Sequence, residues 1–272
     1  MEIGASLATL ELYSSDPAAM ADFYGRTFRL HCEQTGESIA CSADGRHLKV
    51  FAGRAGQLRR AVFRFQSRSD FDAHRSLLST REIQLSELEA DCYTVADPDG
   101  RWITFLAPEV DRTVPPAQGP LRARLQHFAL RSPTPAKLVE FFVNGLGFVL
   151  SDSVFDAAGD LTAAFMRTDS EHHSLAVFRA PEARFDHFSC EAPDWQQLRD
   201  WADHMARTGT NLAWGIGRHG PGNDTFLMVR DPEGNMGEIS AELEVCQPGR
   251  PAGVWPHRPQ TLNQWGVAIM RS

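Results

Sequence analysis

The chain has 272 residues, of which 42% are hydrophobic and 23% are charged, enough to build a buried core for one large domain or two of ordinary size. The net charge of −8 argues against nucleic acid or an anionic membrane as the main partner, because both bind basic surfaces. A small molecule is therefore the expected ligand. The sequence has neither a signal-peptide pattern nor about 18 uninterrupted apolar residues, which favours a cytoplasmic location.

The cysteines are odd in number, scattered along the chain and without a C-x-x-C pair, which indicates neither a disulfide framework nor a zinc ribbon. We expect reduced thiols at all five positions. They are Cys32, Cys41, Cys92, Cys190 and Cys246.

The N-terminal half opens with an alternating strand pattern, a helix-start signal and an apolar-periodic helix, in LATLELYSSDPAAMADFYGRTFRL (residues 7–30). A second helix is expected over residues 69–79. The half closes with a D-P-D-G turn that leads into a final strand, in ADPDGRWITFLAP (residues 96–108).

The C-terminal half repeats this order of features after a Pro-rich break at residues 114–120. It opens with LQHFALRSPTPAKLVEFFVNGLGFVL (residues 125–150) and closes with RDPEGNMGEIS (residues 230–240). Its second helix is expected over residues 194–208, with one buried face at helical spacing. That face is formed by Trp195, Leu198, Trp201, Ala202 and Met205.

These repeats predict an α+β chain of four βαβββ modules, paired into two domains that are each a curled mixed sheet around a cleft. The expected domains are residues 1–113, a domain without metal, and residues 121–243, a metal-binding catalytic domain. Residues 244–272 form an irregular tail, which is either a lid over the cleft or a segment wrapped around the fold.

Three polar residues stand in strands that open or close the modules of the second half: His127, His187 and Glu238. Because side chains alternate along a strand, we expect Leu125 to share a face with His127, and Phe185 to share one with His187. Two imidazoles and a carboxylate on one side of a metal leave positions open for substrate and oxygen, as non-haem Fe(II) chemistry requires.

Taken singly, each of these residues is more simply a satisfied histidine or an exposed glutamate. The first half supplies an internal comparison, because the corresponding positions there are Thr9, Ala61 and Thr104. All three positions are non-ligands in one half and potential ligands in the other, which favours a metal site. Asp186 precedes a candidate ligand histidine and either holds that histidine or faces solvent, and its adjacency in the strand favours solvent.

The sequence resembles the type I extradiol ring-cleaving dioxygenases of the vicinal oxygen chelate superfamily over nearly its whole length. The most specific stretches are LQHFAL, HHSLAVFRAPEARFDHFSC and GIGRHGPGNDTFLMVRDPEGNMGEIS. The resemblance implies that His127, His187 and Glu238 are iron ligands. It also implies Fe(II)-dependent extradiol cleavage of a catechol-type aromatic diol with O2, with Mn(II) as an alternative metal.

Within this resemblance, His173 matches the acid/base residue beside bound oxygen, although the strand pattern alone does not choose between it and His172. His219 matches a histidine near the substrate, and its neighbour Arg218 is an alternative contact. The family places a tyrosine nine residues after that loop histidine, whereas this chain has Met228. Methionine has no proton to give, so the tyrosine's help in orienting and deprotonating the substrate hydroxyl is absent or supplied by another residue.

Further expectations concern the ligands and the assembly. Phe165 and Trp214 are candidate aromatic walls for a substrate ring, alongside Met228 and Arg218. The expected partners are a small aromatic diol and O2, without nucleic acid or membrane, in a homo-oligomer. Two alternatives stay open: another metal-dependent enzyme of the superfamily, of isomerase or lyase type, and a metal-free protein that binds a small aromatic compound.

Overall fold

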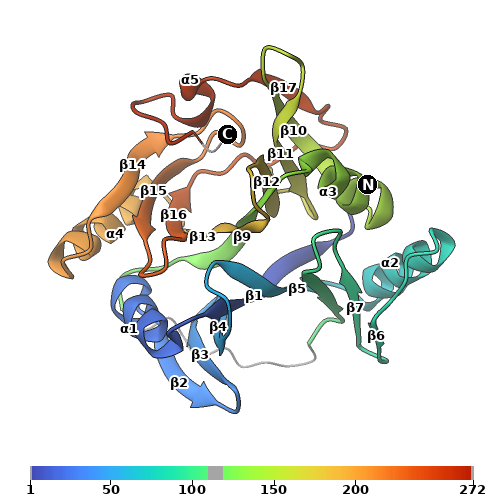
Figure 1. Cartoon of the computed structure of the whole chain (residues 1–272), viewed down its shortest axis with the longest axis horizontal. Helices are drawn as coiled ribbons and strands as arrows, with labels where there is room; N and C mark the ends of the chain where they lie inside the picture. The colour runs from blue at the N-terminus through green and yellow to red at the C-terminus, as the bar shows by residue number, and fades with distance from the viewer. Residues whose placement is uncertain (1, 110–118, 271–272) are drawn as a thin grey trace.

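The computed structural model describes residues 2–109 and 119–270. Its first two modules each consist of a strand, a helix and three strands (Figure 1). The elements of the first module are β1 (Ala5–Ser14), α1 (Pro17–Phe28), β2 (His31–Thr35), β3 (Ser38–Ala43) and β4 (Arg46–Ala52). Those of the second are β5 (Gln57–Phe65), α2 (Arg68–Thr80), β6 (Glu87–Leu88), β7 (Cys92–Ala96) and β8 (Trp102–Leu106).

The C-terminal half repeats this arrangement and adds a tail. The third module contains β9 (Arg124–Ser132), α3 (Pro135–Glu140), the π-helical turn η1 (Phe141–Gly145), β10 (Val149–Phe155), β11 (Leu161–Arg167) and β12 (Leu175–Arg179). The fourth contains β13 (Arg184–Glu191), α4 (Trp195–Arg207), β14 (Leu212–Arg218), β15 (Thr225–Arg230) and β16 (Met236–Ala241). The tail contributes β17 (Gly253–Pro256) and α5 (Pro259–Leu262).

Each half forms one mixed sheet in which two modules meet through their first strands. The order is β2-β3-β4-β1-β5-β8-β7-β6 in the first sheet and β14-β15-β16-β13-β9-β12-β11-β10-β17 in the second. β1 runs antiparallel to β5, and β9 runs antiparallel to β13. The predicted fold class, four βαβββ modules in two mixed sheets, is confirmed.

Local sequence explains where the helices begin. The Asp16 side chain accepts a hydrogen bond from the Ala19 backbone N–H, and a proline follows at the first position of α1. Asp194 caps α4 in the same way. The predicted face of α4 is buried at Leu198, Trp201 and Met205. Trp195 instead lies at the surface, 41% exposed.

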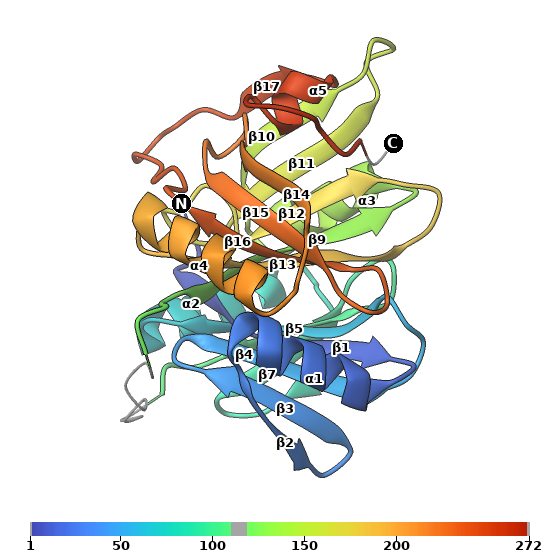
Figure 2. The same ribbon diagram turned by 90° about the vertical axis from the view of Figure 1, so that its left-hand side faces the viewer.

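One hydrophobic core joins the two halves, because their sheets stack on each other (Figure 2). The ring of Phe63 in β5 lies 6.2 Å from Phe128 in β9 and 5.4 Å from Phe148. Tyr24 in α1 packs edge-on against Phe188 in β13 and donates a hydrogen bond to Asp231. Burial of this apolar area is the main stabilising term for such a fold.

The tail adds the edge strand β17, which pairs in parallel with β10. The Pro-rich break predicted at residues 114–120 falls mostly outside the described residues, and the predicted domain boundaries stay a prediction. Within the described residues, no helix has the length and apolar character needed to cross a membrane.

One prediction about the cysteines is wrong. Cys32 and Cys41 face each other across the antiparallel pair β2–β3 and form a disulfide. A sequence pattern cannot reveal such a pair, because the register of two neighbouring strands decides which residues stand opposite. The other cysteines are thiols, as expected: Cys92, Cys190 and Cys246.

Candidate metal centre

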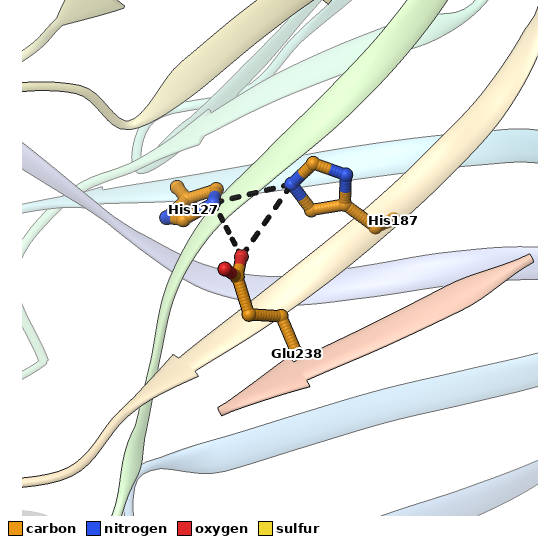
Figure 3. Close-up of side chains that lie close together, drawn as sticks. All are labelled: His127, His187 and Glu238. Atoms are coloured by element: carbon orange, nitrogen blue, oxygen red, sulfur yellow. Dashed lines mark hydrogen bonds and ion pairs between the residues drawn. The ribbon is translucent and has the colours of Figure 1, made fainter. Parts of the chain in front are cut away.

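Three neighbouring strands bring His127, His187 and Glu238 together in the C-terminal sheet (Figure 3). The two imidazole Nε2 atoms lie 3.3 Å apart. Glu238 Oε2 lies 3.2 Å from Nε2 of His127 and 3.6 Å from Nε2 of His187. Two atoms that each lie about 2.1 Å from one ion are roughly 3.0 to 3.4 Å apart at octahedral or tetrahedral angles and about 4.2 Å apart at most, so this triangle suits a single metal.

The strand register accounts for the convergence. In the central pair, His127 of β9 stands opposite Ser189 of β13, and Ser189 stands opposite Glu238 of β16. His187 lies two residues before Ser189 and therefore points to the same side of the sheet. All three candidate ligands are buried, with at most 4% of each residue exposed.

A β-bulge precedes each candidate ligand histidine. The β9–β13 ladder skips Gln126 on one strand and Asp186 on the other, and an extra residue of this kind re-aims the side chains beside it. The expected face-sharing of Leu125 and Phe185 with the histidines is therefore wrong. Both pack in the main core with Phe128.

The two bulge residues hold the histidines. Asp186 Oδ1 accepts a hydrogen bond from Nδ1 of His187 at 2.7 Å, and its other oxygen accepts one from Arg131 at 2.6 Å. Asp186 is only 1% exposed, so the expectation that it faces solvent is wrong. Gln126 Oε1 lies 2.5 Å from Nδ1 of His127.

The orientation of the Gln126 amide follows from its other contacts. Its Nε2 lies 2.8 Å from the carbonyl oxygen of His173 and 3.2 Å from Glu171 Oε2. Both of these atoms can only accept, so Nε2 donates to them and Oε1 must accept from His127.

The Nδ1 atoms of His127 and His187 consequently carry the hydrogens, and their Nε2 lone pairs point at each other and at Glu238. Two lone pairs and a carboxylate in one buried space repel unless a cation lies between them. Among the described residues, neither Glu238 oxygen has a hydrogen-bond partner. Histidines held through Nδ1 by an amide or carboxylate are typical of metal ligands, and the site therefore fits a divalent metal.

The pKa shifts agree with this assignment. Burial lowers the pKa of His127, so its imidazole is neutral and able to bind a metal. Burial raises the pKa of Glu238, but its interactions with His127 and His219 outweigh burial and hold that pKa well below its usual range. With Nδ1 of His187 donating to Asp186, the centre offers two Nε2 atoms and one carboxylate.

The N-terminal sheet corrects one of the three counterpart positions. Its ladder aligns Thr9 with Val62 and Val62 with Thr104, which matches the order His127, Ser189, Glu238 in the other sheet. The residue that corresponds to His187 is then Arg60, two before Val62, and the expected Ala61 is wrong. A bulge at Arg59 shifts the register. The guanidinium of Arg60 donates to Thr104 Oγ1 at 3.3 Å, so a cation stands at this position of the N-terminal half.

His173 lies beside the candidate metal centre, whereas His172 points away from it. The His173 ring is centred 4.3 Å from that of His127 and 5.2 Å from that of Phe165. Burial lowers the pKa of His173 well below its usual value, and the neighbouring histidines lower it further. His173 is therefore a neutral imidazole next to an aromatic wall.

His219 approaches the centre from the loop after β14. Its Nδ1 donates to the carbonyl oxygen of Leu262 at 2.6 Å, and its Nε2 lies 3.4 Å from Glu238 Oε1. The ring stacks on Phe226 at 3.8 Å. Burial lowers the pKa of His219, but Asp224 and Glu238 raise it by more.

Asp224 is a site residue that our sequence analysis did not identify. It is fully buried, and neither of its oxygens has a hydrogen-bond partner among the described residues. Burial raises its pKa to about 7, against the lowering effect of His219. With His219 and Glu238 it forms a second group of ligand-type atoms that lie within 4.8 Å of one another. Its spacing from Phe226 and Met228, on one face of the strand, was the available signal.

Of the remaining expected substrate contacts, Met228 and Trp214 lie in a buried apolar cluster, whereas Arg218 is held in an ion pair. Met228 stands opposite Glu238 in the β15–β16 ladder and packs with Trp214 in a buried cluster. The Trp214 indole donates to the carbonyl oxygen of Val267 in the tail at 2.7 Å. Arg218 pairs with Glu242 at 2.5 Å, and its guanidinium lies over an exposed tryptophan of the tail.

Comparison with known proteins places this geometry in a family context. Residues 124–239 match the Glyoxalase/Bleomycin resistance protein/Dioxygenase superfamily. Metapyrocatechase 2 of Cupriavidus necator is 30% identical over 174 residues, which cover 63% of this chain and 51% of that protein. The chain spans about half the length of the curated relatives it matches.

Two solved structures share the fold over almost the whole chain. The Mn(II)-bound glyoxalase from Novosphingobium aromaticivorans has a TM-score of 0.78 at 22% identity, covering 98% of this chain and 92% of that one. Homoprotocatechuate 2,3-dioxygenase from Brevibacterium fuscum, in complex with 3,4-dihydroxyphenylacetate, has a TM-score of 0.77 at 22% identity, covering 97% and 89%. Residues 124–239 therefore belong to the glyoxalase/bleomycin resistance protein/dioxygenase superfamily, and the chain has distant similarity to extradiol dioxygenases.

Proposed function

We propose that this protein is an Fe(II)-dependent extradiol dioxygenase that opens a catechol-type ring with O2. The observation that carries the proposal is the convergence of two Nε2 lone pairs and one buried carboxylate, with the Nδ1 atoms of both histidines held by Gln126 and Asp186. In this proposal His127, His187 and Glu238 hold the metal. Residues 121–243 are the catalytic domain, and residues 1–113 form a domain without metal.

The donor set supports iron as the metal. A site with two histidines and one carboxylate on one side is typical of non-haem Fe(II) oxygen chemistry, while the same ligands also suit Mn(II). When bound, the metal would bind the two adjacent oxygens of a catechol, lower the pKa of their hydroxyls and bring O2 beside the ring.

His173 is the proposed acid/base residue. Its ring lies 4.3 Å from that of His127, beside the candidate metal centre, where an imidazole can take a proton from the substrate and return it to an oxygen atom during ring opening. Phe165 packs edge-on against His173 and supplies an apolar wall. Both atoms of O2 end in the open-chain product, a coloured semialdehyde or keto acid.

His219 and its neighbours form the other side of the proposed substrate site. Its Nδ1–H is used by the Leu262 carbonyl oxygen, so its Nε2 is the atom left to face the substrate. Trp214 and Met228 offer apolar surface for the ring. Arg218 stays the alternative polar contact, although its guanidinium is paired with Glu242.

Met228 favours a second candidate function, a metal-dependent isomerase or lyase of the same superfamily. A thioether cannot deprotonate a phenol, and a chain that does not act on a catechol has no need of a tyrosine there. A metal-free protein that binds a small aromatic compound is a third reading, which a metal-free purified protein would support.

Metal analysis and oxygen uptake test the proposal together. The protein is reconstituted anaerobically with Fe(II), and a panel of catechols is then added with air while O2 consumption and visible absorbance are recorded. We expect about one iron per chain, O2 uptake, and a new absorption band with at least one diol. Stoichiometric iron without O2 uptake for any vicinal diol would overturn ring cleavage and favour the isomerase or lyase.

A further inference from the structure

A second buried carboxylate, Asp152 in β10, lies behind the candidate metal centre. Its side chain is 1% exposed, and its Oδ2 lies 3.2 Å from Nε2 of His172. The same oxygen accepts a hydrogen bond from the Trp255 indole at 2.6 Å. Its Oδ1 accepts from the Gly253 backbone N–H and from Arg250 Nη1, both at 3.0 Å.

The tail supplies three of these four contacts, and its close approach needs a glycine. β17 pairs with β10 so that Gly253 stands beside Asp152. A Cβ atom on Gly253 would lie 2.5 Å from Asp152 Oδ1, closer than real contacts allow. Arg250 is anchored in turn by Glu244, at 2.6 and 3.0 Å. The tail is thus built around this carboxylate.

The contacts of Asp152 decide its protonation. The indole N–H, the guanidinium and the backbone N–H can only donate, so the carboxyl accepts on both oxygens and is ionised. Burial raises its pKa, but its interactions with His172, Trp255 and Arg250 outweigh burial and lower the pKa to about 2. Nε2 of His172 lies 3.2 Å from Oδ2 but outside hydrogen-bond geometry among the described residues. A hydrogen on this nitrogen is still favoured, because a lone pair there would face an ionised carboxylate.

The other ring nitrogen of His172 faces the next residue, His173. A His172 ring whose single hydrogen is on Nε2 has a lone pair on Nδ1, and that atom lies 3.0 Å from Nδ1 of His173. Two lone pairs would repel at this distance, so Nδ1 of His173 carries the hydrogen and donates it. The lone pair of His173 is then on Nε2, the nitrogen that could accept a proton from a substrate.

We propose that Asp152 is a positioning residue that sets the tautomer of His173 through His172, and that the C-terminal tail holds Asp152 in place for this role. The proposal rests on the proposed function, in which His173 transfers protons. Asp152 would act as the outer carboxylates of other histidine relays do, by fixing which ring nitrogen carries the hydrogen. It does not touch the substrate.

Asp152→Asn is the direct test, because an amide of the same size can donate to His172 Nε2 and reverse the relay. The full chain is labelled with 15N-histidine and loaded with Zn(II), a diamagnetic ion that the same ligands bind. Long-range 1H–15N spectra report the tautomer of each histidine, and His173→Gln assigns the His173 signals. We expect a hydrogen on Nδ1 of His173 in the unmodified protein, and its loss or a tautomer mixture in Asp152→Asn.

Turnover provides the second readout. In the Fe(II)-loaded enzyme, Asp152→Asn should lower kcat roughly tenfold to a hundredfold, the usual effect of losing an outer partner of a site histidine, with iron content and KM little changed. The matched control is Asp156→Asn, four residues further along and paired with Arg179 at 2.8 Å. The control should change neither the spectrum of His173 nor kcat.

His172→Gln tests the same relay if Asp152→Asn fails to fold. This substitution removes the imidazole between Asp152 and His173 but leaves the tail contacts of Asp152. A protein with both His172→Gln and Asp152→Asn should turn over no more slowly than His172→Gln alone, because the effects of residues in one hydrogen-bonded chain are not additive. An unchanged His173 tautomer in a folded Asp152→Asn or His172→Gln protein would overturn the proposal. A changed tautomer in a protein without ring-cleaving activity would leave the relay intact and overturn only the proposed function.

Discussion

Nε2 of His74 in α2 lies 2.7 Å from the carbonyl oxygen of Leu146, which joins the N-terminal half to the C-terminal half. The carbonyl can only accept, so Nε2 carries the hydrogen and Nδ1 accepts from the Tyr93 hydroxyl at 2.6 Å. His74 is 3% exposed and is held in its neutral form. Both ring nitrogens are used, and an added proton would place a charge in this buried site.

Stability should therefore fall as the pH is lowered. Burial lowers the pKa of His74 from 6.5 to about 4, against an opposing contribution from the Leu146 carbonyl. Between these values the unfolded chain binds a proton that the folded chain does not, so the stabilisation is full above pH 6.5 and is lost towards pH 4. The total effect is on the order of 3 kcal/mol. Urea unfolding at a series of pH values measures it.

His74→Gln isolates this contribution, because glutamine has no proton to gain. Its unfolding free energy should depend less steeply on pH below 6.5 than that of the unmodified protein. His31→Gln is the control, since the side chain of His31 is 80% exposed. Equal pH dependence in the unmodified protein and His74→Gln would contradict the assignment.

Metal binding should depend strongly on the candidate ligands and less strongly on Asp186, which accepts a hydrogen bond from one of them. His187→Ala and Glu238→Gln remove ligands and should abolish stoichiometric metal. Asp186→Asn keeps the ligands but weakens the hydrogen bond that orients the His187 ring. The affinity for the metal should fall roughly tenfold to a hundredfold. Elemental analysis and chelator competition measure both effects, with His31→Gln as the unchanged control. Full affinity in Asp186→Asn would mean that its hydrogen bond to His187 has no influence on the metal.

His173→Gln should separate metal binding from turnover. His173 contacts His127 through ring packing but is outside the triad, so iron content should be kept. Loss of a proton-transfer group should slow turnover by about a hundredfold. Steady-state O2 uptake at matched iron occupancy measures the change. Unmodified turnover in this variant would remove His173 from the mechanism.

Met228→Tyr tests whether a hydroxyl is missing from the site. We expect greater activity toward simple catechols than in the unmodified protein, because the tyrosine restores a group that can orient and deprotonate a substrate hydroxyl. Met228 is 1% exposed and closely packed, so the larger ring should also cost roughly 1–3 kcal/mol of stability.

Met228→Phe is the matched control, since it adds the ring without the hydroxyl. It should lower the melting temperature as Met228→Tyr does, without the gain in activity. A similar activity in both variants would show that the hydroxyl has no role at this position. Oxygen uptake and thermal melting are measured on the same iron-loaded samples.

Local signals in the sequence were sufficient for the architecture. Asp16 and Asp194 mark helix starts, and the D-P-x-G turns lead into the last strands of each half. These features act over a few residues, so they can be recognised without knowing the fold. Comparison of the two halves then identified His127, His187 and Glu238, because a repeated module places equivalent residues at equivalent points.

The tertiary structure alone decided how those residues are supported. The bulges at Gln126 and Asp186 shift the two-residue alternation by one position, so the strand pattern misassigned Asp186. The cross-strand register of the first sheet gives Arg60, in place of Ala61, as the counterpart of His187. Cross-strand register paired Cys32 with Cys41.

The relay through Asp152 depends in the same way on distant parts of the chain. A tail strand about a hundred residues away packs onto β10 and surrounds that carboxylate. The sequence by itself determined the modules and the ligand triad, since both follow from short-range chemistry and repetition. Only the tertiary structure determined the bonds that orient the triad and His173, because these join residues whose separation along the chain has no periodic signature.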